Sequence, residues 1–262
     1  MSNTSGLARV GEEALNKQGC LVKIIEYNNA NDIVVEFQDK YKARVHTKYC
    51  HFLSGDIKNP YYPSVLGVGM KGCLYPTRDE YGNYIKEYTT WNNMLKRCFD
   101  KKEKEKHKTY KNVCCCDEWL VYDNFYKWAT TQSNYNLWKC GGNNWHLDKD
   151  ILSKDSVYSP KTCCFVPDIV NKLFNKQRLH RSSLPIGVQK NGDNFMARCR
   201  NPLNDSISEY LGTYKTPLEA FLVYKTYKED IIKQIAQIEF DAGNITEDCY
   251  NAMMKYEVRV TD

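Results

Sequence analysis

No single hydrophobic period persists along this chain, and that feature most constrains what it can fold into. Short runs of alternating apolar residues predict strands, runs with apolar residues three and four apart predict helices, and Gly, Pro, Asn and Asp separate the two kinds. A coiled coil, a collagen-like chain and a disordered chain are therefore excluded. No stretch approaches the ~18 consecutive apolar residues of a membrane span. We expect small domains of the α+β class.

The first predicted domain covers residues 8–60. Residues 21–27 and 33–37 have the alternation of strands with a polar turn between them, and residues 41–45 predict a third strand. Short strands joined by tight turns predict a small β-barrel-like domain. Two roles stay open for it, an accessory module that contacts DNA or protein and a purely structural domain.

The second predicted domain covers residues 85–178. One helix is predicted from an apolar face with i, i+3, i+4 and i+7 spacing, formed by Trp91, Met94, Leu95 and Cys98. An exposed charged loop, a hairpin-like stretch and a short helix are predicted further along, at residues 101–108, 146–152 and 169–174. This domain therefore combines short helices with a small sheet.

The third predicted domain covers residues 184–238 and joins three strands to one helix. The strands are expected at residues 186–189, 194–200 and 206–214. Thr216 and Glu219 form a capping-box pattern with Pro217 at the first helical position, which predicts where the helix begins. Residues 239–262 are predicted as an acidic C-terminal tail.

Charge is distributed unevenly along the chain. Basic and acidic residues number 8 and 7 in residues 1–60 (+1), 18 and 13 in 61–176 (+5), 9 and 6 in 177–235 (+3), and 2 and 6 in 236–262 (−4), which sum to the net +5. A basic body with 13% aromatic residues suggests a nucleic-acid partner. The competing interpretation is ordinary solvated surface lysine.

The twelve cysteines bear on two expectations, the redox compartment of the protein and whether it binds structural zinc. Residues 1–6 lack the apolar core of a secretory signal, so we expect a cytoplasmic protein (host-cell cytoplasm if phage-encoded) with reduced, mostly buried thiols. No C-x-x-C spacing occurs, and structural Zn²⁺ is accordingly not expected. The zinc alternative requires one site built from Cys98, Cys114 or Cys116, Cys140, and Cys163 or Cys164.

The third domain resembles the APETALA/ethylene-response-factor type of DNA-binding domain. The matching residues are Gly187-Val188, Phe195 to Arg200, Leu211 to Thr216, Glu219-Ala220 and Tyr224. The resemblance implies a three-stranded sheet that lies in the major groove of double-stranded DNA. The DNA-binding residues assigned on this basis are Lys190, Arg198, Arg200 and Lys215.

Strand alternation agrees with this interpretation, because it places Met196, Arg198 and Arg200 on one side of the middle strand. Two arginines on one exposed strand face suit bidentate contacts with guanine or phosphate. The family usually has Trp where Phe195 stands. The alternative is a small α+β interaction module with no DNA role.

The second domain resembles phage HNH-type nuclease domains. The matching residues are Trp91, Met94 and Cys98, Val113 to Trp119, Phe125 and Trp128, 147–150, 158–160, Thr162 and Cys163. The resemblance implies a ββα unit around one divalent metal, Mg²⁺ or another ion, that hydrolyses phosphodiester bonds. It assigns Asp148 and Asn171 as metal ligands.

The match departs from the family at two catalytic positions. Lys149 stands where the general-base His belongs, and Thr162 stands where the Asn that orients this His belongs. Two alternatives would retain catalysis. In the first, His146, which shares a strand face with Asp148 and Asp150, forms a shifted site with them. In the second, Lys149 acts as a cation on the phosphate. We therefore assign His146 and Lys149 as catalytic candidates. The alternative is a degenerate domain that keeps the fold without cutting.

The first domain is similar to the small barrel that accompanies such phage nucleases. It shares Gly11 to Glu13, Ile24 to Tyr27 and Lys58 to Tyr61. We expect a phage or mobile-element DNA-binding protein of homing-endonuclease type, with double-stranded DNA as partner and with neither a membrane nor a small-molecule substrate. A non-catalytic DNA-binding regulator is the alternative, and a protein-interaction scaffold is a third candidate. Oligomeric state does not follow from the sequence.

Overall fold

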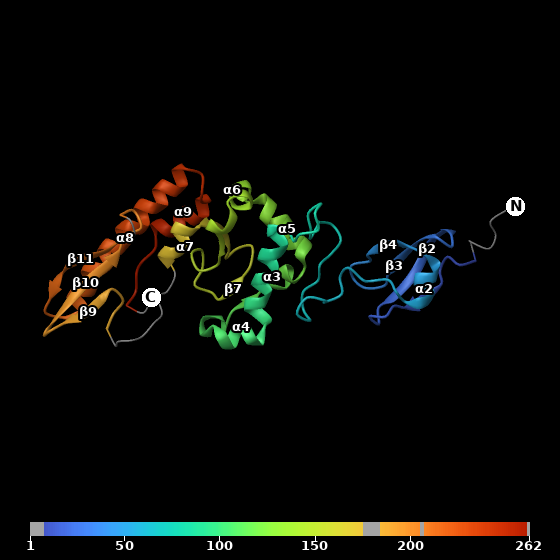
Figure 1. Cartoon of the computed structure of the whole chain (residues 1–262), viewed down its shortest axis with the longest axis horizontal. Coiled ribbons are helices and arrows are strands. Elements are labelled where there is room, and N and C mark those ends of the chain that lie inside the picture. The colour runs from blue at the N-terminus through green and yellow to red at the C-terminus, as the bar shows by residue number, and fades with distance from the viewer. Residues whose placement is uncertain (1–7, 175–183, 205–206, 261–262) are drawn as a thin grey trace. The chain divides into compact units, whose positions relative to one another are not determined.

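The computed structural model describes residues 8–174, 184–204 and 207–260, in which helices mix with short strands (Figure 1). The α+β class is therefore confirmed, and none of the small sheets in the described residues closes into a barrel. The chain divides into two compact units, one up to Trp128 and the other from Ala129 onward. Among the described residues, no helix is both long and apolar enough to cross a membrane.

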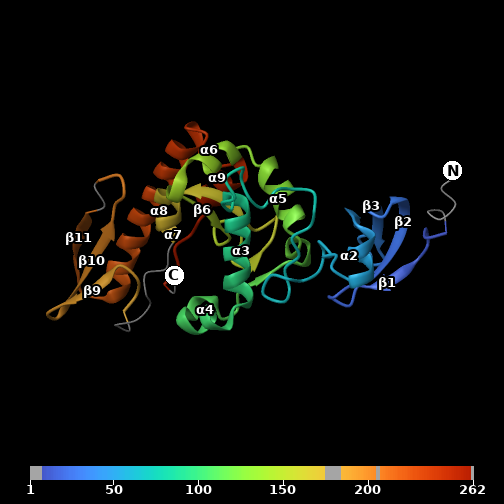
Figure 2. The ribbon, with the colours of Figure 1, turned by 45° about the vertical axis from the view of Figure 1, so that its right-hand side comes forward.

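An antiparallel sheet with the strand order β1-β2-β3-β4 begins the first unit. Figure 2 shows its strands β1, β2 and β3 beside α2. Its strands are β1 (Glu13–Leu15), β2 (Leu21–Asn29), β3 (Asp32–Phe37) and β4 (Arg44–Thr47), and α2 (Tyr49–Ser54) follows. The alternation in β2 and β3 buries Val22, Ile24, Ile33 and Val35 against Phe52 of α2. The predicted strands at 21–27 and 33–37 are confirmed, and the described sheet is open, with β1 and β4 at its edges.

The rest of the first unit is mainly helical. It contains α3 (Lys86–Phe99), α4 (Lys101–Lys106), the 3-10 turn η1 (Lys108–Tyr110), β5 (Cys114–Cys115), the 3-10 turn η2 (Asp117–Leu120) and the start of α5 (Tyr122–Thr131). The predicted apolar face of α3 is confirmed, because Trp91, Met94, Leu95 and Cys98 are all buried. The loop predicted at 101–108 is wrong: most of it is α4 and η1, since Asp100 caps α4 by accepting the N–H groups of Lys102 and Glu103.

A buried carboxylate fastens the chain around Gly72 to the start of α5. Asp123 accepts hydrogen bonds from the Tyr61 hydroxyl (3.1 Å) and from the N–H groups of Cys73 (3.0 Å) and Leu74 (3.2 Å). A Cβ on Gly72, whose φ is +73°, would lie 1.9 Å from Asp123 Oδ2. Only glycine allows this close approach.

The second unit contains a ββα arrangement, which follows a short helix. Its elements are α6 (Tyr135–Cys140), the 3-10 turn η3 (Gly142–Asn144), β6 (Trp145–Asp148), β7 (Val157–Tyr158), β8 (Cys164–Pro167) and α7 (Asp168–Phe174). Strands β6 and β8 pair antiparallel, with Leu147 opposite Phe165. Trp138 of α6 stacks on Phe165 with ring centroids 4.1 Å apart, so α6 packs against β8.

The C-terminal sheet of the second unit has the order β11-β10-β9 and is packed against α8 (Figure 1). Its elements are β9 (Val188–Asn191), β10 (Asn194–Arg200), β11 (Ser208–Tyr214) and α8 (Pro217–Asp241). The predicted capping box is confirmed, because the Thr216 side chain accepts the Glu219 N–H and the Glu219 carboxylate accepts the Thr216 N–H. A Cβ on Gly187 would lie 2.1 Å from the Tyr224 ring, so glycine lets α8 approach the sheet.

The acidic residues after 238 are not a loose tail where the structure describes them. Helix α9 (Glu247–Met254) buries Cys249 and Met253, and Ile245 and Val258 on either side of it are buried too. All four belong to one hydrophobic core with β8, α7, the C-terminal sheet and α8. Apolar residues spaced four apart lie among the acidic ones, and an argument from net charge alone does not detect them.

Candidate functional site

The outward face of the C-terminal sheet carries the first set of predicted site residues. Ala197 and Cys199 of β10 are 0% and 2% exposed and pack toward α8. Strand alternation therefore turns Met196, Arg198 and Arg200 to the opposite face, as the sequence predicted. Arg198 is half-buried and Arg200 is exposed.

Arg198 is held in place by the neighbouring strand. Its Nη2 donates a hydrogen bond to the Ser208 carbonyl oxygen at 3.2 Å, and its Nε is buried without a hydrogen-bond partner among the described residues. A guanidinium oriented by its own sheet loses less side-chain freedom when it binds a ligand. Because Nε is buried, a bidentate contact with a ligand would use the Nη1 and Nη2 end of the guanidinium.

The other two predicted DNA contacts lie elsewhere. Lys190 of β9 pairs with Phe195, and directly paired residues of an antiparallel sheet point to the same side. Lys190 therefore leaves the sheet on the α8 side, opposite Arg198. Lys215 follows β11 and is exposed, and its N–H donates to Glu219 Oε2 at 3.1 Å in the turn before α8.

Tyr210 was missed by the sequence reasoning. It pairs with Arg198 across β10 and β11, so it shares the outward face, and it is 59% exposed. Its hydroxyl lies 2.9 Å from Thr213 Oγ1. The alternation of β11 indicated that Tyr210 faces outward. The bulge between Ala197 and Arg198 shifts the register, however, so the sequence alone does not predict that Tyr210 pairs with Arg198.

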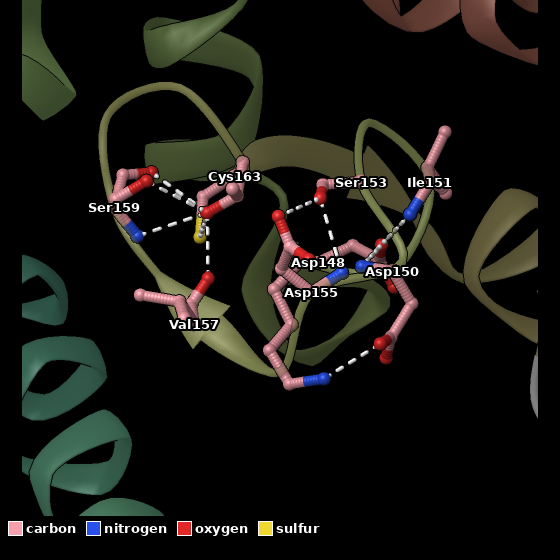
Figure 3. Close-up of polar contacts among 10 residues, drawn as sticks. Asp148, Asp150, Ile151, Ser153, Asp155, Val157, Ser159 and Cys163 are labelled. Carbon is pink, nitrogen blue, oxygen red and sulfur yellow. Dashed lines mark hydrogen bonds and ion pairs between the residues drawn. The ribbon is translucent and has the colours of Figure 1, made fainter. Parts of the chain in front are cut away.

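The second set of predicted residues lies around β6. Asp148 ends the strand, is 7% exposed, and accepts the N–H groups of Asp150 (2.8 Å) and Ile151 (2.9 Å) through Oδ1 (Figure 3). Burial raises the pKa of Asp148, and the neighbouring Asp150 charge acts in the same direction, while the two N–H groups and Lys149 oppose it. The carboxyl group therefore shapes the loop that leaves β6.

Lys149 and Thr162, which stand at the two substituted catalytic positions, also make polar contacts within the segment that follows β6. Lys149 Nζ lies 2.6 Å from Asp150 Oδ1. Thr162 Oγ1 donates to the Val157 carbonyl oxygen at 2.6 Å and accepts the Ser159 N–H at 3.0 Å (Figure 3). Asp148, Lys149 and Thr162 thus connect successive parts of the segment between β6 and β8.

His146 contacts a different carboxylate from Asp148 and Asp150, the two with which the sequence analysis grouped it. Its Nε2 lies 3.2 Å from Oδ1 of Asp168, the first residue of α7, and Lys172 also bonds to Asp168. These partners lower the pKa of Asp168, with Lys172 contributing most. The sequence reasoning missed Asp168 because His146 and Asp168 become neighbours only through the pairing of His146 with Val166.

The predicted metal ligands come from β6 and α7. Asn171 lies in α7, one turn after Asp168, and is half-buried. Across residues 8–174, 184–204 and 207–260, no three His, Cys, Asp or Glu side chains converge as a metal site would require. Asp148 also has its Oδ1 bonded to two backbone N–H groups. The described residues therefore show no completed donor set for a divalent ion, and we derive no chemistry through one.

All twelve cysteines are free thiols. Cys98, Cys163, Cys164, Cys199 and Cys249 are buried, whereas Cys50, Cys73, Cys114 and Cys140 are exposed. Burial raises the pKa of the Cys163 thiol to about 12. The expectation that most thiols are buried is therefore wrong, because seven of the twelve are exposed or half-buried.

Comparison with known proteins finds no matching family model, no matching curated protein and no matching solved structure.

Proposed function

We propose that this protein binds double-stranded DNA through the outward face of its C-terminal sheet and does not cleave it. The observation that carries the proposal is the outward row of Met196, Arg198 and Arg200 on β10, with α8 packed against the other side. Arginine forks are the commonest readers of guanine in the major groove. This row supports the proposal that the sheet binds DNA, which the sequence resemblance to a DNA-binding domain also favours.

Tyr210 strengthens the proposal. An exposed aromatic ring directly opposite Arg198 adds an apolar surface and a hydroxyl to the arginine row. A face that mixes arginine, tyrosine and hydroxyl groups offers contacts to both bases and phosphates. Lys190 is not part of this face, and we assign it no base contact.

The proposed absence of cleavage is supported by how three side chains are used. Asp148, Lys149 and Thr162 occupy the positions of the metal ligand, the general base and its orienting residue in the HNH resemblance. Each makes its hydrogen bonds or ion pair within the segment between β6 and β8. We therefore propose a binding or scaffolding role for the ββα unit.

The binding proposal is tested by fluorescence anisotropy on duplexes enriched by repeated selection with the wild-type protein. Arg198→Ala plus Arg200→Ala is expected to weaken binding and to remove sequence preference, at about 1–3 kcal/mol for each bidentate contact. Arg198→Lys plus Arg200→Lys keeps the charge without the fork, so it should retain salt-dependent binding and lose the preference. Lys190→Ala is the matched control on the other side of the sheet.

Unchanged affinity and preference in the double alanine variant would remove the sheet face as the reader. Absence of any salt-sensitive binding of the wild-type protein to duplex DNA would instead contradict the proposed function, because phosphate contacts release counterions.

Metal-dependent hydrolysis is the second candidate, favoured by the ββα order of β6, β8 and α7 with Asp148 at a strand end. A supercoiled plasmid that carries the selected sequence is incubated with Mg²⁺ or with EDTA. We expect no nicking by the wild-type protein under either condition. EDTA-sensitive nicking that Asp148→Ala abolishes would establish the nuclease, with His146 or Lys149 near the phosphate.

A further inference from the structure

Positive charge is concentrated in one short segment of the first unit. Residues 96–111 contain eight basic and three acidic residues, a formal charge of +5, which equals the net +5 of the whole chain. The segment comprises the end of α3, the whole of α4 and η1. Such a concentration raises the local potential well above that of a surface with interspersed charges.

Most of these lysines are exposed without a neutralising partner. We name five of them the α4 lysine cluster: Lys101, Lys102, Lys106, Lys108 and Lys111. All five are exposed, and none forms an ion pair with a carboxylate in the part of the chain that the structure describes. Elsewhere in the chain Lys17, Lys23, Lys149, Lys172 and Lys225 do form such pairs.

Two of the three acidic residues in the segment are engaged locally. Asp100 accepts the N–H groups of Lys102 (2.8 Å) and Glu103 (3.3 Å) as the α4 cap. Glu103 lies 3.8 Å from His107. Neither carboxylate therefore forms an ion pair with a lysine of the cluster, and Glu105 is the one exposed acidic residue of the segment.

The cluster is presented by an ordered scaffold. Lys104 Nζ donates to the Val113 carbonyl oxygen at 3.2 Å and so fastens α4 to the chain that follows η1. His107 and Tyr110 place their rings 5.1 Å apart. Lys102 and Lys106 are one helical turn apart and therefore lie on the same side of α4.

We infer that the α4 lysine cluster is a second DNA-contacting surface, which binds the phosphate backbone without reading sequence. This inference rests on the proposed DNA-binding function and extends it to the first unit. Lysine is a compact, strongly hydrated point charge that suits phosphate and offers no fork for base edges. The cluster therefore contributes affinity and salt dependence, and the arginine face of β10 contributes preference.

The test compares salt slopes on a random-sequence duplex. The variant carries Gln at Lys101, Lys102, Lys106 and Lys108. A charge-preserving control carries Arg at the same four positions. A location control carries Gln at four other exposed lysines of the first unit, Lys40, Lys42, Lys48 and Lys58. Far-UV circular dichroism and urea midpoints establish that each variant is folded.

The slope of log K against log salt should become shallower in the glutamine variant by about 0.9 for each lysine that contacts phosphate, so by about 3.6 if all four do. The arginine control and the location control should keep the wild-type slope. The glutamine variant should also keep the wild-type preference for the selected sequence.

Three results would overturn the inference while leaving the sheet face intact: an unchanged slope, an equal change in the location control, or a loss of sequence preference in the glutamine variant. A wild-type protein without salt-dependent binding would overturn the proposed function instead, so the two failures are distinguishable.

Discussion

Asp148 is a carboxylate whose surroundings favour its neutral form. Burial is the largest cause of its raised pKa, and its oxygen serves as an acceptor for two loop N–H groups. An amide oxygen accepts the same two bonds without the cost of burying a charge. Asp148→Asn should therefore preserve the loop, whereas Asp148→Ala leaves two N–H groups without their acceptor and should cost about 1–3 kcal/mol in the free energy of unfolding.

The pH dependence of stability tests this account of Asp148. A raised folded-state pKa contributes stability that is fully present below the ordinary value of 3.8 and is lost as the pH rises through the raised value. The free energy of unfolding of Asp148→Asn should therefore increase relative to that of the wild type as the pH rises above the ordinary value of 3.8. Urea titrations at several pH values measure the difference. A gain of the wild type over the variant in this range would contradict the assignment.

The thiol of Cys163 should be unreactive in the folded protein. It is 2% exposed, and burial raises its pKa to about 12, so the nucleophilic thiolate is scarce at neutral pH. Pulsed iodoacetamide labelling followed by peptide mass spectrometry should modify Cys50 and Cys140 first and Cys163 only after unfolding. The exposed cysteines serve as the internal control, and early labelling of Cys163 would show that the turn before β8 opens readily.

At the scale of elements, α9 should be essential to the second unit in spite of its acidic sequence. Met253 is 0% exposed and belongs to the core formed with α8 and the C-terminal sheet. Met253→Ala should lower the free energy of unfolding by about 2–5 kcal/mol. Met254, 36% exposed on the same helix, provides the matched control, and Met254→Ala should change stability little. Equal effects of the two substitutions would mean that α9 does not pack as described.

Elements that depend on neighbouring residues could be predicted, and those that depend on remote ones could not. The α3 face and the Thr216 capping box were found because their signals lie within a few residues. Helix α4 was missed because a run of alternating charges has no apolar face, and its formation depends on the Asp100 cap. The pairing of Tyr210 with Arg198 depends on a bulge that only the register of the sheet reveals.

At the scale of the whole molecule, separate cores should respond separately to substitution. Ile24 lies in the core of the N-terminal sheet and Ile235 in the core of the second unit, and both are 0% exposed. Ile24→Ala should reduce amide protection in β1 to β4, and Ile235→Ala should reduce it in β9 to β11. Hydrogen exchange with mass spectrometry measures both. Loss of protection in both units from either substitution would contradict the division at Trp128.

The sequence by itself determined the α+β class, several of the helices and strands, and the outward direction of Arg198 and Arg200, because each follows from local periodicity. Only the tertiary structure decided that His146 contacts Asp168, that Asp148 bonds to its own loop and that the acidic C-terminal segment joins a core. The physical reason is that strand register and helix packing bring together residues far apart in the chain, and neither composition nor spacing encodes those distances directly.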